Sequence, residues 1–449
     1  MSKNIVELKK EIGFYGLTMV AVGSCIGSGI FLTPSQIATH LKSPLLILLV
    51  WGLGGLITLT GALTFAELGS IFPKAGGVYV FLKESYGDLF GFLYGWGYLL
   101  VICSGAIAAL SIAFAYYLSF LIPLGGTGKV AIAVTAVVVV TIINIVRVKA
   151  GEVFSNLFTG LKLIGIASVI LAGLFLGSPD VMRSERILPA SSGNMAMAFG
   201  LALIGVLWSY GGWQHASFVA GEAKDASRTV PRAMVLGAFV VAGIYLLTNL
   251  AYLFLLPVDK ITSSDSLAAD AVSLVVPFGG PVIAGIIAIS VFGIAGIYTL
   301  SSPRIYYAMA RDGLFFKKMA EVHPRFKTPV NAILSQSIWA IVLLLFWGTF
   351  EDVITYVVFI DWIFFALAGA AIFIFRFKRK GIARPYRTWG YPVTPVIFIS
   401  ISTFFVINTL IGKPIQAWAG LIFMVVGLLF FFYFKKIRIR SAEGKDKVL

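Results

Sequence analysis

Long, nearly continuous apolar stretches dominate the chain, and short polar segments separate them. Each stretch has about the 20 residues that an α-helix needs to cross the hydrocarbon core of a bilayer. The alternating ten-residue segments of a transmembrane β-barrel are absent from the sequence. The pattern therefore predicts an all-α polytopic membrane protein with twelve spans. We place them at residues 13–39, 44–72, 88–120, 129–146, 153–176, 195–221, 232–256, 279–308, 329–348, 353–377, 391–412 and 416–434.

The composition agrees with this pattern. Of the 449 residues, 59% are hydrophobic and only 12% are charged, whereas soluble domains have about 25% charged residues. This balance excludes an ordinary soluble enzyme, a disordered protein and a disulfide scaffold. Common hydrolase, metalloprotease and C-x-x-C motifs are absent, so we expect no enzyme activity, metal ion or cofactor. Cys25 and Cys103 both lie within apolar spans, and no structural disulfide is expected.

The net charge of +15 indicates the orientation of the chain. The basic run at 435–440 follows an apolar stretch and lacks aromatic residues that would stack on bases, so no nucleic-acid partner is expected. Of the 35 Lys and Arg residues, 28 lie on one side of the predicted spans, the side of both termini, and six lie on the other. The positive-inside rule then places both termini in the cytoplasm. Because the connections near 177–194 and 257–278 are too short for a soluble domain, residues 1–449 are predicted to form one transmembrane domain.

The first span has a weak point at residues 23–29. Three glycines and two serines among these seven residues disfavour a helix interior. Non-helical backbone at membrane depth is tolerated only where it is buried in protein or lines a cavity. One interpretation is an unwound segment that forms part of a site. The alternative is close helix packing through Gly23 and Gly27, which have the G-x-x-x-G spacing.

The sixth span has a second weak point, because Gly211 and Gly212 lie between aromatic residues. Polar Ser209 and Gln214 lie beside them, and a packing notch lined by aromatic residues is the alternative here. Interrupted spans in corresponding positions of two chain halves indicate the midplane site of a transporter. Broken helices leave backbone N–H groups free for a carboxylate and carbonyl groups free for an ammonium group, so a zwitterion suits both.

Four ionisable residues lie deep in the predicted spans or beside a break. Lys162 lies ten residues from Glu152 at the cytoplasmic end of span five, about 15 Å along a helix. It is either an internal cation held by unwound carbonyls or a purely structural buried lysine. The carboxyls of Glu67 and Asp361 are expected to be protonated, paired or bonded to backbone, and each is a candidate proton relay. His215 adjoins the second break as a core histidine or as a substrate contact.

Several motifs resemble those of amino acid–polyamine–organocation transporters, particularly the L-type subfamily. They lie at 27–31 (GSGIF), 66–68 (AEL), 73–79 (PKAGGVY), 221–222 (GE), 228–233 (RTVPRA), 302–304 (SPR), 307–313 (YAMARDG) and 323–329 (HPRFKTP). The match covers nearly the whole chain in the right order. The resemblance implies the leucine-transporter fold with discontinuous spans one and six. Its two inverted five-helix repeats would occupy about 13–176 and 195–377, with two further helices at about 391–434.

The resemblance also implies roles for the residues at the first break. The backbone of Gly27, Ser28 and Gly29 matches the segment that binds the substrate carboxylate. Cys25 and Ile26 occupy the turn just before it.

At the second break, Trp208 matches the aromatic residue that gates the site. Ser209, Gly211 and Gly212 would supply carbonyl groups for the substrate ammonium. Gln214 falls where L-type members often have asparagine.

Lys162 matches a span-five lysine that takes the place of sodium in sodium-independent members. Where relatives often have a small polar partner for this lysine, the chain has Ile294-Ala295-Gly296, and we expect Tyr298 or Thr299 to substitute. Residues 121–129 contain no cysteine. No disulfide-linked glycoprotein partner is therefore expected, and we predict a stand-alone transporter in the cytoplasmic membrane of a bacterium.

These observations together predict a sodium-independent transporter of neutral L-amino acids that works by alternating access as an exchanger. A permanent internal cation removes the need for a driving ion, and slow return of the empty carrier favours exchange. Proton symport is the alternative, and it requires Lys162 or Glu67 to titrate. An amino-acid-binding receptor or channel without coupled turnover is the alternative from another class. No carboxylate is predicted beside the substrate side chain, which weighs against cationic amino acids.

Overall fold

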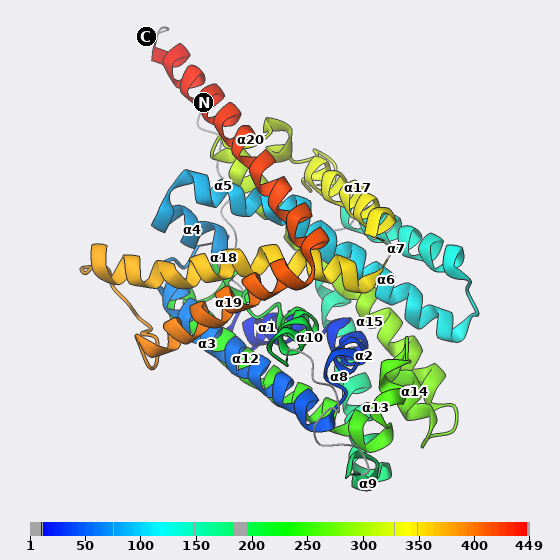
Figure 1. Ribbon diagram of the computed structural model, residues 1–449. Coiled ribbons are helices and arrows are strands. Elements are labelled where there is room, and N and C mark those ends of the chain that lie inside the picture. The colour runs from blue at the N-terminus through cyan, green and yellow to red at the C-terminus, as the bar shows by residue number, and fades with distance from the viewer. Residues whose placement is uncertain are drawn as a thin grey trace.

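The computed structural model is built almost entirely of helices (Figure 1), and it describes residues 10, 12–74, 76–146, 150–183, 195–326, 328–347 and 349–446. The helices up to residue 183 are α1 (Phe14–Cys25), α2 (Gly29–Leu41), α3 (Pro44–Ile71), α4 (Val78–Tyr86), α5 (Asp88–Gly97), α6 (Ser104–Leu121), α7 (Gly126–Val146), α8 (Ala150–Leu176) and α9 (Pro179–Arg183). A π-helical turn, η1 (Tyr98–Cys103), joins α5 to α6.

The helices from residue 195 onward continue the same architecture. They are α10 (Met195–Tyr210), α11 (His215–Phe218), α12 (Ala226–Leu255), α13 (Val258–Thr262), α14 (Leu267–Ser273), α15 (Gly279–Ser301), α16 (Pro303–Arg311), α17 (Val330–Trp347), α18 (Phe350–Lys378), α19 (Val393–Gly412) and α20 (Pro414–Asp446). Two short 3₁₀ turns, η2 (Ala220–Glu222) and η3 (Lys317–Ala320), lie between them.

The predicted all-α architecture is confirmed. Within the described residues, ten helical stretches are long and apolar enough to cross a membrane. Two shorter apolar helices, Lys162–Leu176 and Met195–Tyr210, coincide with the predicted spans five and six. The number of twelve membrane crossings and the two inverted repeats stay predictions.

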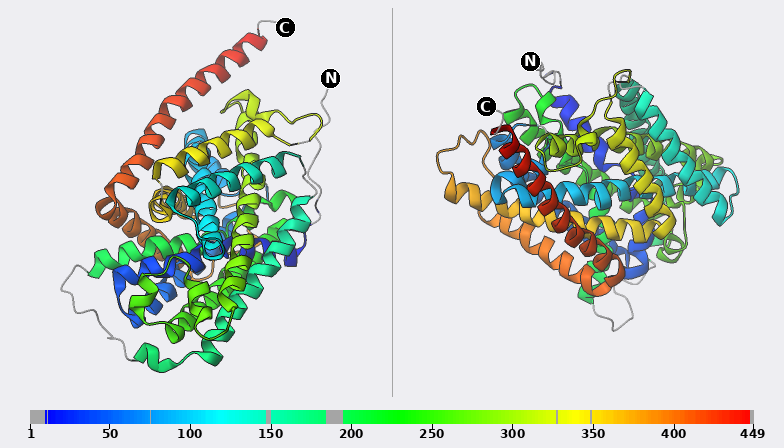
Figure 2. Two further views of the ribbon diagram at one scale, coloured as in Figure 1. Left: turned by 90° about the vertical axis from the view of Figure 1, so that its right-hand side faces the viewer. Right: turned by 90° about the horizontal axis from the view of Figure 1, so that it is seen from above.

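Two elements differ from their predicted bounds. The predicted span at 279–308 is divided at Ser302, because Pro303 starts the new helix α16 at a position where its missing N–H is harmless. The last helix, α20, continues to Asp446 instead of ending at residue 434. Lys and Arg are good helix formers, so the basic segment extends the apolar helix. Figure 2 shows this end of α20 projecting beyond the other helices.

The helices pack in two groups. In the first group, α12 packs along α3 and α1, and α10 packs against α2. In the second group, α6 packs against α7, α15 and α17. Two helices connect the groups, because α8 contacts both α12 and α15, and α18 contacts α3, α10 and α6. The helix ends around both predicted weak points, those of α1, α2 and α10, thus belong to the first group, and α1 and α10 lie near the centre of Figure 1.

Candidate functional site

The first weak point is a gap between two helices. α1 ends at Cys25 and α2 begins at Gly29, so residues 26–28 are outside both helices. The N–H of Ile26 still donates to the carbonyl of Val22 at 3.0 Å. Among the described residues, the N–H groups of residues 27–30 have no acceptor. The start of α2 therefore presents free donors at the positive end of its helix dipole.

Side chains from other helices satisfy carbonyl groups at the end of α1. The ammonium group of Lys162, on α8, donates to the carbonyl of Gly23, and Lys162 is only 1% exposed. The hydroxyl oxygen of Tyr245, on α12, lies 2.7 Å from the carbonyl oxygen of Cys25 and 2.9 Å from that of Ser209. Tyr245 therefore joins the end of α1 to the end of α10.

The second weak point is also a gap, at residues 211–214 between α10 and α11. The N–H of Gly211 donates to the carbonyl of Trp208 at 3.1 Å, which tightens the end of α10. The side-chain oxygen of Gln214 accepts from the N–H of Gly212 at 2.9 Å, so this side chain folds back onto the gap.

Two glycines bring these gaps into contact. Gly212 has φ of +130°, and a Cβ atom there would lie 2.5 Å from the carbonyl carbon and oxygen of Ser24. A Cβ atom at Gly29 would lie 2.4 Å from the hydroxyl oxygen of Ser209. At Gly27, in contrast, a Cβ atom would make only ordinary contact, at 3.5 Å from Ile294. Close packing therefore occurs between the two gaps through Gly29 and Gly212.

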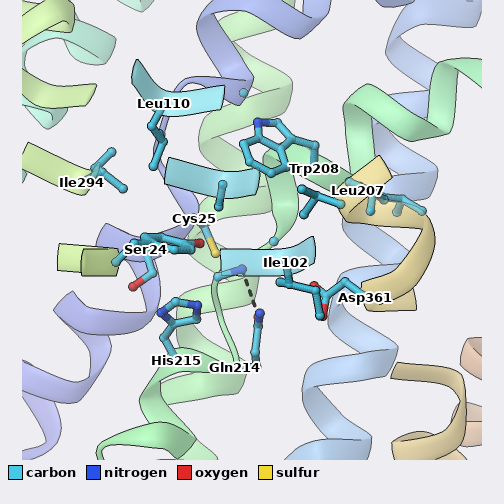
Figure 3. A pocket seen from close by; sticks show the side chains of 18 of the residues that line it. Ser24, Cys25, Ile102, Leu110, Leu207, Trp208, Gln214, His215, Ile294 and Asp361 are labelled. Carbon is cyan, nitrogen blue, oxygen red and sulfur yellow. Dashed lines mark hydrogen bonds between the residues drawn. The ribbon is translucent and has the colours of Figure 1, made fainter. Parts of the chain in front are cut away.

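A cavity lies between the gaps and the second helix group (Figure 3). It leaves about 50 Å³ for the centres of water-sized groups. The gaps and adjoining helix ends contribute Ser24, Cys25, Gly27, Ser28, Gly29, Leu207, Trp208, Gly211, Gly212, Gln214 and His215. The opposite wall consists of Tyr98, Ile102, Ala106, Leu110, Ile294, Tyr298, Val357, Val358, Asp361 and Trp362.

Eight of the ten predicted substrate-binding residues line this cavity, and the other two lie behind it. Ile26 is fully buried, with 0% exposure. The hydroxyl of Ser209 donates to the carbonyl of Gly205 at 2.7 Å and lies 2.9 Å from the hydroxyl of Thr33. Trp208 lines the cavity and donates from its indole to the hydroxyl of Ser28 at 3.4 Å.

Lys162 lies outside the lining of the cavity, and its expected partners are engaged elsewhere. The hydroxyl of Thr299 donates to a carbonyl of its own helix at 2.8 Å. The ring of Tyr298 packs against that of His215, with centroids 4.9 Å apart. Among the described residues, the carbonyl of Gly23 is the partner of the Lys162 ammonium. The last turn of α1 thus supplies the acceptor that was expected from span eight.

Glu67 also lies away from the cavity, in an ion-pair network at the end of α3. Its side chain is 0% exposed, and Arg376 donates to its two oxygens at 2.9 and 2.6 Å. The backbone N–H of Thr388 donates to the same carboxylate at 2.7 Å, and Arg384 lies 3.5 Å away. Glu67 is therefore paired with arginine and also bonded to backbone, which are two of the three states that the sequence left open.

Two residues near the gaps differ from what the sequence indicated. Tyr245 has no sequence signal, because a tyrosine within an apolar helix does not reveal which carbonyl groups its hydroxyl reaches. Asp361 does carry a signal, as an acid deep in a predicted span. We expected no carboxylate beside the substrate side chain. This expectation is wrong for the cavity described here, because Asp361 lines it.

Comparisons with known proteins identify the family of the chain. The family model described as amino acid permease matches residues 12–431. The chain is 35% identical to the serine/threonine exchanger SteT of Bacillus subtilis (strain 168), over 96% of this chain and 98% of the relative. It is 29% identical to the human b(0,+)-type amino acid transporter 1, over 98% and 91% of the two chains, and to the human Asc-type amino acid transporter 1, over 95% and 82%. The chain thus belongs to the amino acid permease family, within the amino acid–polyamine–organocation superfamily of membrane transporters.

Proposed function

We propose that this amino acid permease is a sodium-independent exchanger of small neutral L-amino acids, which works by alternating access in the cytoplasmic membrane of a bacterium. The substrate sits in the cavity between the two gaps. Its carboxylate and ammonium groups bind main-chain atoms, and its side chain faces the second helix group.

The free N–H groups of residues 27–30 carry this proposal. They form the start of the 13-residue helix α2, beside the cavity, and have no acceptor among the described residues. Such a helix start is a ready site for a carboxylate. The carbonyl groups of Ser24 and Gly211, two residues that line the cavity, have no donor among the described residues. An α-ammonium group supplies the donors that these carbonyl groups lack.

The position of Lys162 supports sodium independence. Its ammonium group is buried and bonded to the carbonyl of Gly23, two residues before the end of α1. A covalently attached cation stabilises the exposed carbonyl end of α1 without an ion from solution. Because such a charge cannot leave with the substrate, it drives no net uptake, which favours exchange against a second amino acid.

The size of the cavity and the names of the relatives support a small substrate. The space open to the centres of water-sized groups is small, about 50 Å³, which favours a compact substrate side chain. The bacterial relative is named a serine/threonine exchanger, and two mammalian relatives are named amino acid transporters. We therefore propose alanine-, serine- and threonine-sized substrates.

Counterflow into proteoliposomes tests this proposal. Purified protein is reconstituted into vesicles with or without internal L-serine, and uptake of radiolabelled L-serine is measured in sodium and in choline buffer. We expect uptake only into loaded vesicles, equal in both buffers, and unchanged by a pH gradient. Uptake into empty vesicles driven by a proton gradient indicates symport instead. Saturable binding without any uptake indicates a receptor, and uptake that does not saturate indicates a channel.

A further inference from the structure

The cavity contains one carboxyl group, which the proposed binding of the substrate backbone leaves unused. Asp361 lies on α18 and lines the cavity (Figure 3). Its Oδ1 atom is buried and has no hydrogen-bond partner among the described residues. The rest of the side chain is partly exposed toward the cavity. Buried carboxyl oxygens are rarely left without a donor, because the loss of hydration is costly.

The surroundings of Asp361 are otherwise mostly apolar. In Figure 3 it lies beside Ile102 and on the side of the cavity opposite Ile294. Val357, Val358 and Trp362, from its own helix, line the same wall. None of these side chains offers a donor to the carboxyl group except the indole of Trp362, and no hydrogen bond joins the two in the structure. The hydroxyls of Tyr98 and Tyr298 also line the cavity, but no hydrogen bond joins either of them to Asp361. The partly exposed carboxyl group is therefore open to a donor that enters the cavity.

Asp361 and the free main-chain donors lie on opposite walls. The N–H groups of residues 27–30 belong to the first helix group, whereas Asp361 belongs to α18, which contacts both groups. A substrate whose carboxylate binds at the start of α2 directs its side chain across the cavity, toward α6, α15 and α18. The small volume favours a compact side chain.

We propose that the Asp361 carboxyl group accepts a hydrogen bond from the side-chain hydroxyl of the substrate, and that it thereby selects serine and threonine over alanine and valine. This inference rests on the proposed exchange function and adds a specificity-determining residue to it. A site built to bond a hydroxyl rejects the apolar analogue, because the buried acceptor is then left unpaired. Threonine and valine have nearly the same shape, so their comparison isolates the hydroxyl.

Competition in the counterflow assay provides the first test. Proteoliposomes that contain the wild-type protein are loaded with L-alanine, and kcat/KM is measured for uptake of external serine, alanine, threonine and valine. We expect threonine to exceed valine, and serine to exceed alanine, on the order of 10- to 100-fold. Equal values within each pair overturn the role of Asp361 while exchange itself stands. If none of the four amino acids exchanges, the proposed function fails before specificity is at issue.

Substitutions of Asp361 provide the second test. Asp361→Leu keeps the branching and the number of heavy atoms of the side chain but removes the acceptor, and we expect the threonine-to-valine ratio to fall about tenfold or more through loss of threonine uptake. Asp361→Asn retains one oxygen acceptor and is expected to keep most of the preference. An Asp361→Leu variant that keeps the wild-type ratio, or that lowers uptake of both amino acids equally, overturns the proposal.

Ser290→Ala is the matched control. The hydroxyl of Ser290, on α15, is also buried and has no partner in the part of the chain that the structure describes, but Ser290 does not line the cavity. We expect this variant to keep the wild-type ratio. A shift as large as that of Asp361→Leu attributes the ratio to general packing and contradicts the proposal. If Asp361→Leu fails to fold, the wild-type ratios and the Asp361→Asn variant still decide the matter.

Discussion

The buried ammonium of Lys162 is the single residue on which sodium independence depends. Replacement by alanine removes the donor from the Gly23 carbonyl and the positive charge from the end of α1. A hydrogen bond from a charged donor contributes about 1.5–3 kcal/mol. We expect Lys162→Ala to lower counterflow about 10- to 100-fold, while size-exclusion profiles show a folded protein.

Lys129→Ala is the control for this prediction. Lys129 pairs with Asp265 at 3.6 Å, and the Asp265 side chain is 77% exposed. An exposed pair contributes about 1 kcal/mol or less, so counterflow should stay near the wild-type rate. Near-normal flux in Lys162→Ala would remove this lysine from the mechanism.

Because the two gaps are in contact, we expect a single methyl group added at Gly212 to affect stability and binding. Gly212 has φ of +130°, and its added Cβ atom would overlap the backbone of Ser24. Strained backbone of this kind costs about 1–3 kcal/mol, and the overlap adds to that cost. We expect Gly212→Ala to lower the thermal unfolding temperature and to abolish binding, measured as loss of the thermal shift on adding L-serine.

Gly243→Ala is its counterpart within α12. A Cβ atom at Gly243 meets nothing within 4 Å, and alanine in place of glycine stabilises a helix interior by about 0.8–1 kcal/mol. This variant should unfold at the wild-type temperature or slightly higher. Equal behaviour of the two variants would contradict the close approach of the gaps.

Residue chemistry could be predicted where it follows from backbone requirements. Glycine clusters within apolar spans mark places where a helix is weak, so eight of the eleven lining residues in the gaps and adjoining helix ends were found from the sequence. Ile26 and Ser209 lie in the same segments as the lining residues but do not line the cavity. They differ from their neighbours only in the direction of the side chain. Sequence alone does not give that direction, because the gaps follow neither the helical nor the strand period. For the same reason the partners of Lys162 and Tyr245 required the structure.

At the scale of elements, the length of an apolar stretch predicted a helix reliably, whereas the sequence did not predict how the helices pack. The predicted spans and the helices agree closely where a helix crosses an apolar environment, because backbone polar groups must be satisfied internally there. Segments outside that environment were missed, including α4 and the short helices α13 and α14. The π-helical turn η1 was also missed, although its residues Tyr98 and Ile102 line the cavity. Such a turn changes the hydrogen-bond spacing without a distinct composition.

The network of Glu67 links three elements and predicts a large effect on stability. Glu67 belongs to α3, Arg376 to α18, and Thr388 to the segment between α18 and α19. Removing one partner of a fully buried ion pair costs about 3–5 kcal/mol. The cost here is lower because the Arg376 side chain is 24% exposed and stays partly hydrated. We expect Glu67→Gln to lower the thermal unfolding temperature markedly in detergent.

Glu84→Gln is the matched control for this network. Its pair with Arg379 is 3.2 Å long, and the two side chains are 40% and 45% exposed. Such a pair contributes about 1 kcal/mol or less, so the unfolding temperature should barely change. If Glu67→Gln unfolds at the wild-type temperature but abolishes counterflow, the acid acts in transport and not in stability, as the proton-symport alternative requires.

At the scale of the whole molecule, the cavity lies between two helix groups rather than within one. The gaps belong to α1, α2, α10 and α11, and the opposite wall belongs to η1, α6, α15 and α18. Under the proposed alternating access, a change in the relative position of the groups would alter access to the cavity while the main-chain site in the gaps stays intact.

The charge distribution predicts how this assembly lies in the membrane. With 28 of 35 basic residues on one side, the connection after α18 faces the cytoplasm and the connection between α13 and α14 faces the exterior. Lys380 and Ser263 are exposed residues in these two connections. The native cysteines, Cys25 and Cys103, are buried, at 3% and 0% exposure, and are poor targets for a maleimide.

Labelling of intact cells with a membrane-impermeant maleimide tests this orientation. We expect Ser263→Cys to react in intact cells and Lys380→Cys to react only after permeabilisation, while the protein without an added cysteine stays unlabelled. The reverse pattern would place both termini outside. Reaction of both variants in intact cells would mean that an even number of crossings separates the two connections, instead of the three predicted spans. Because a missed helix exchanges the sides of every later loop, one such pair of cysteines tests the span assignment between α14 and α18 together with the charge rule.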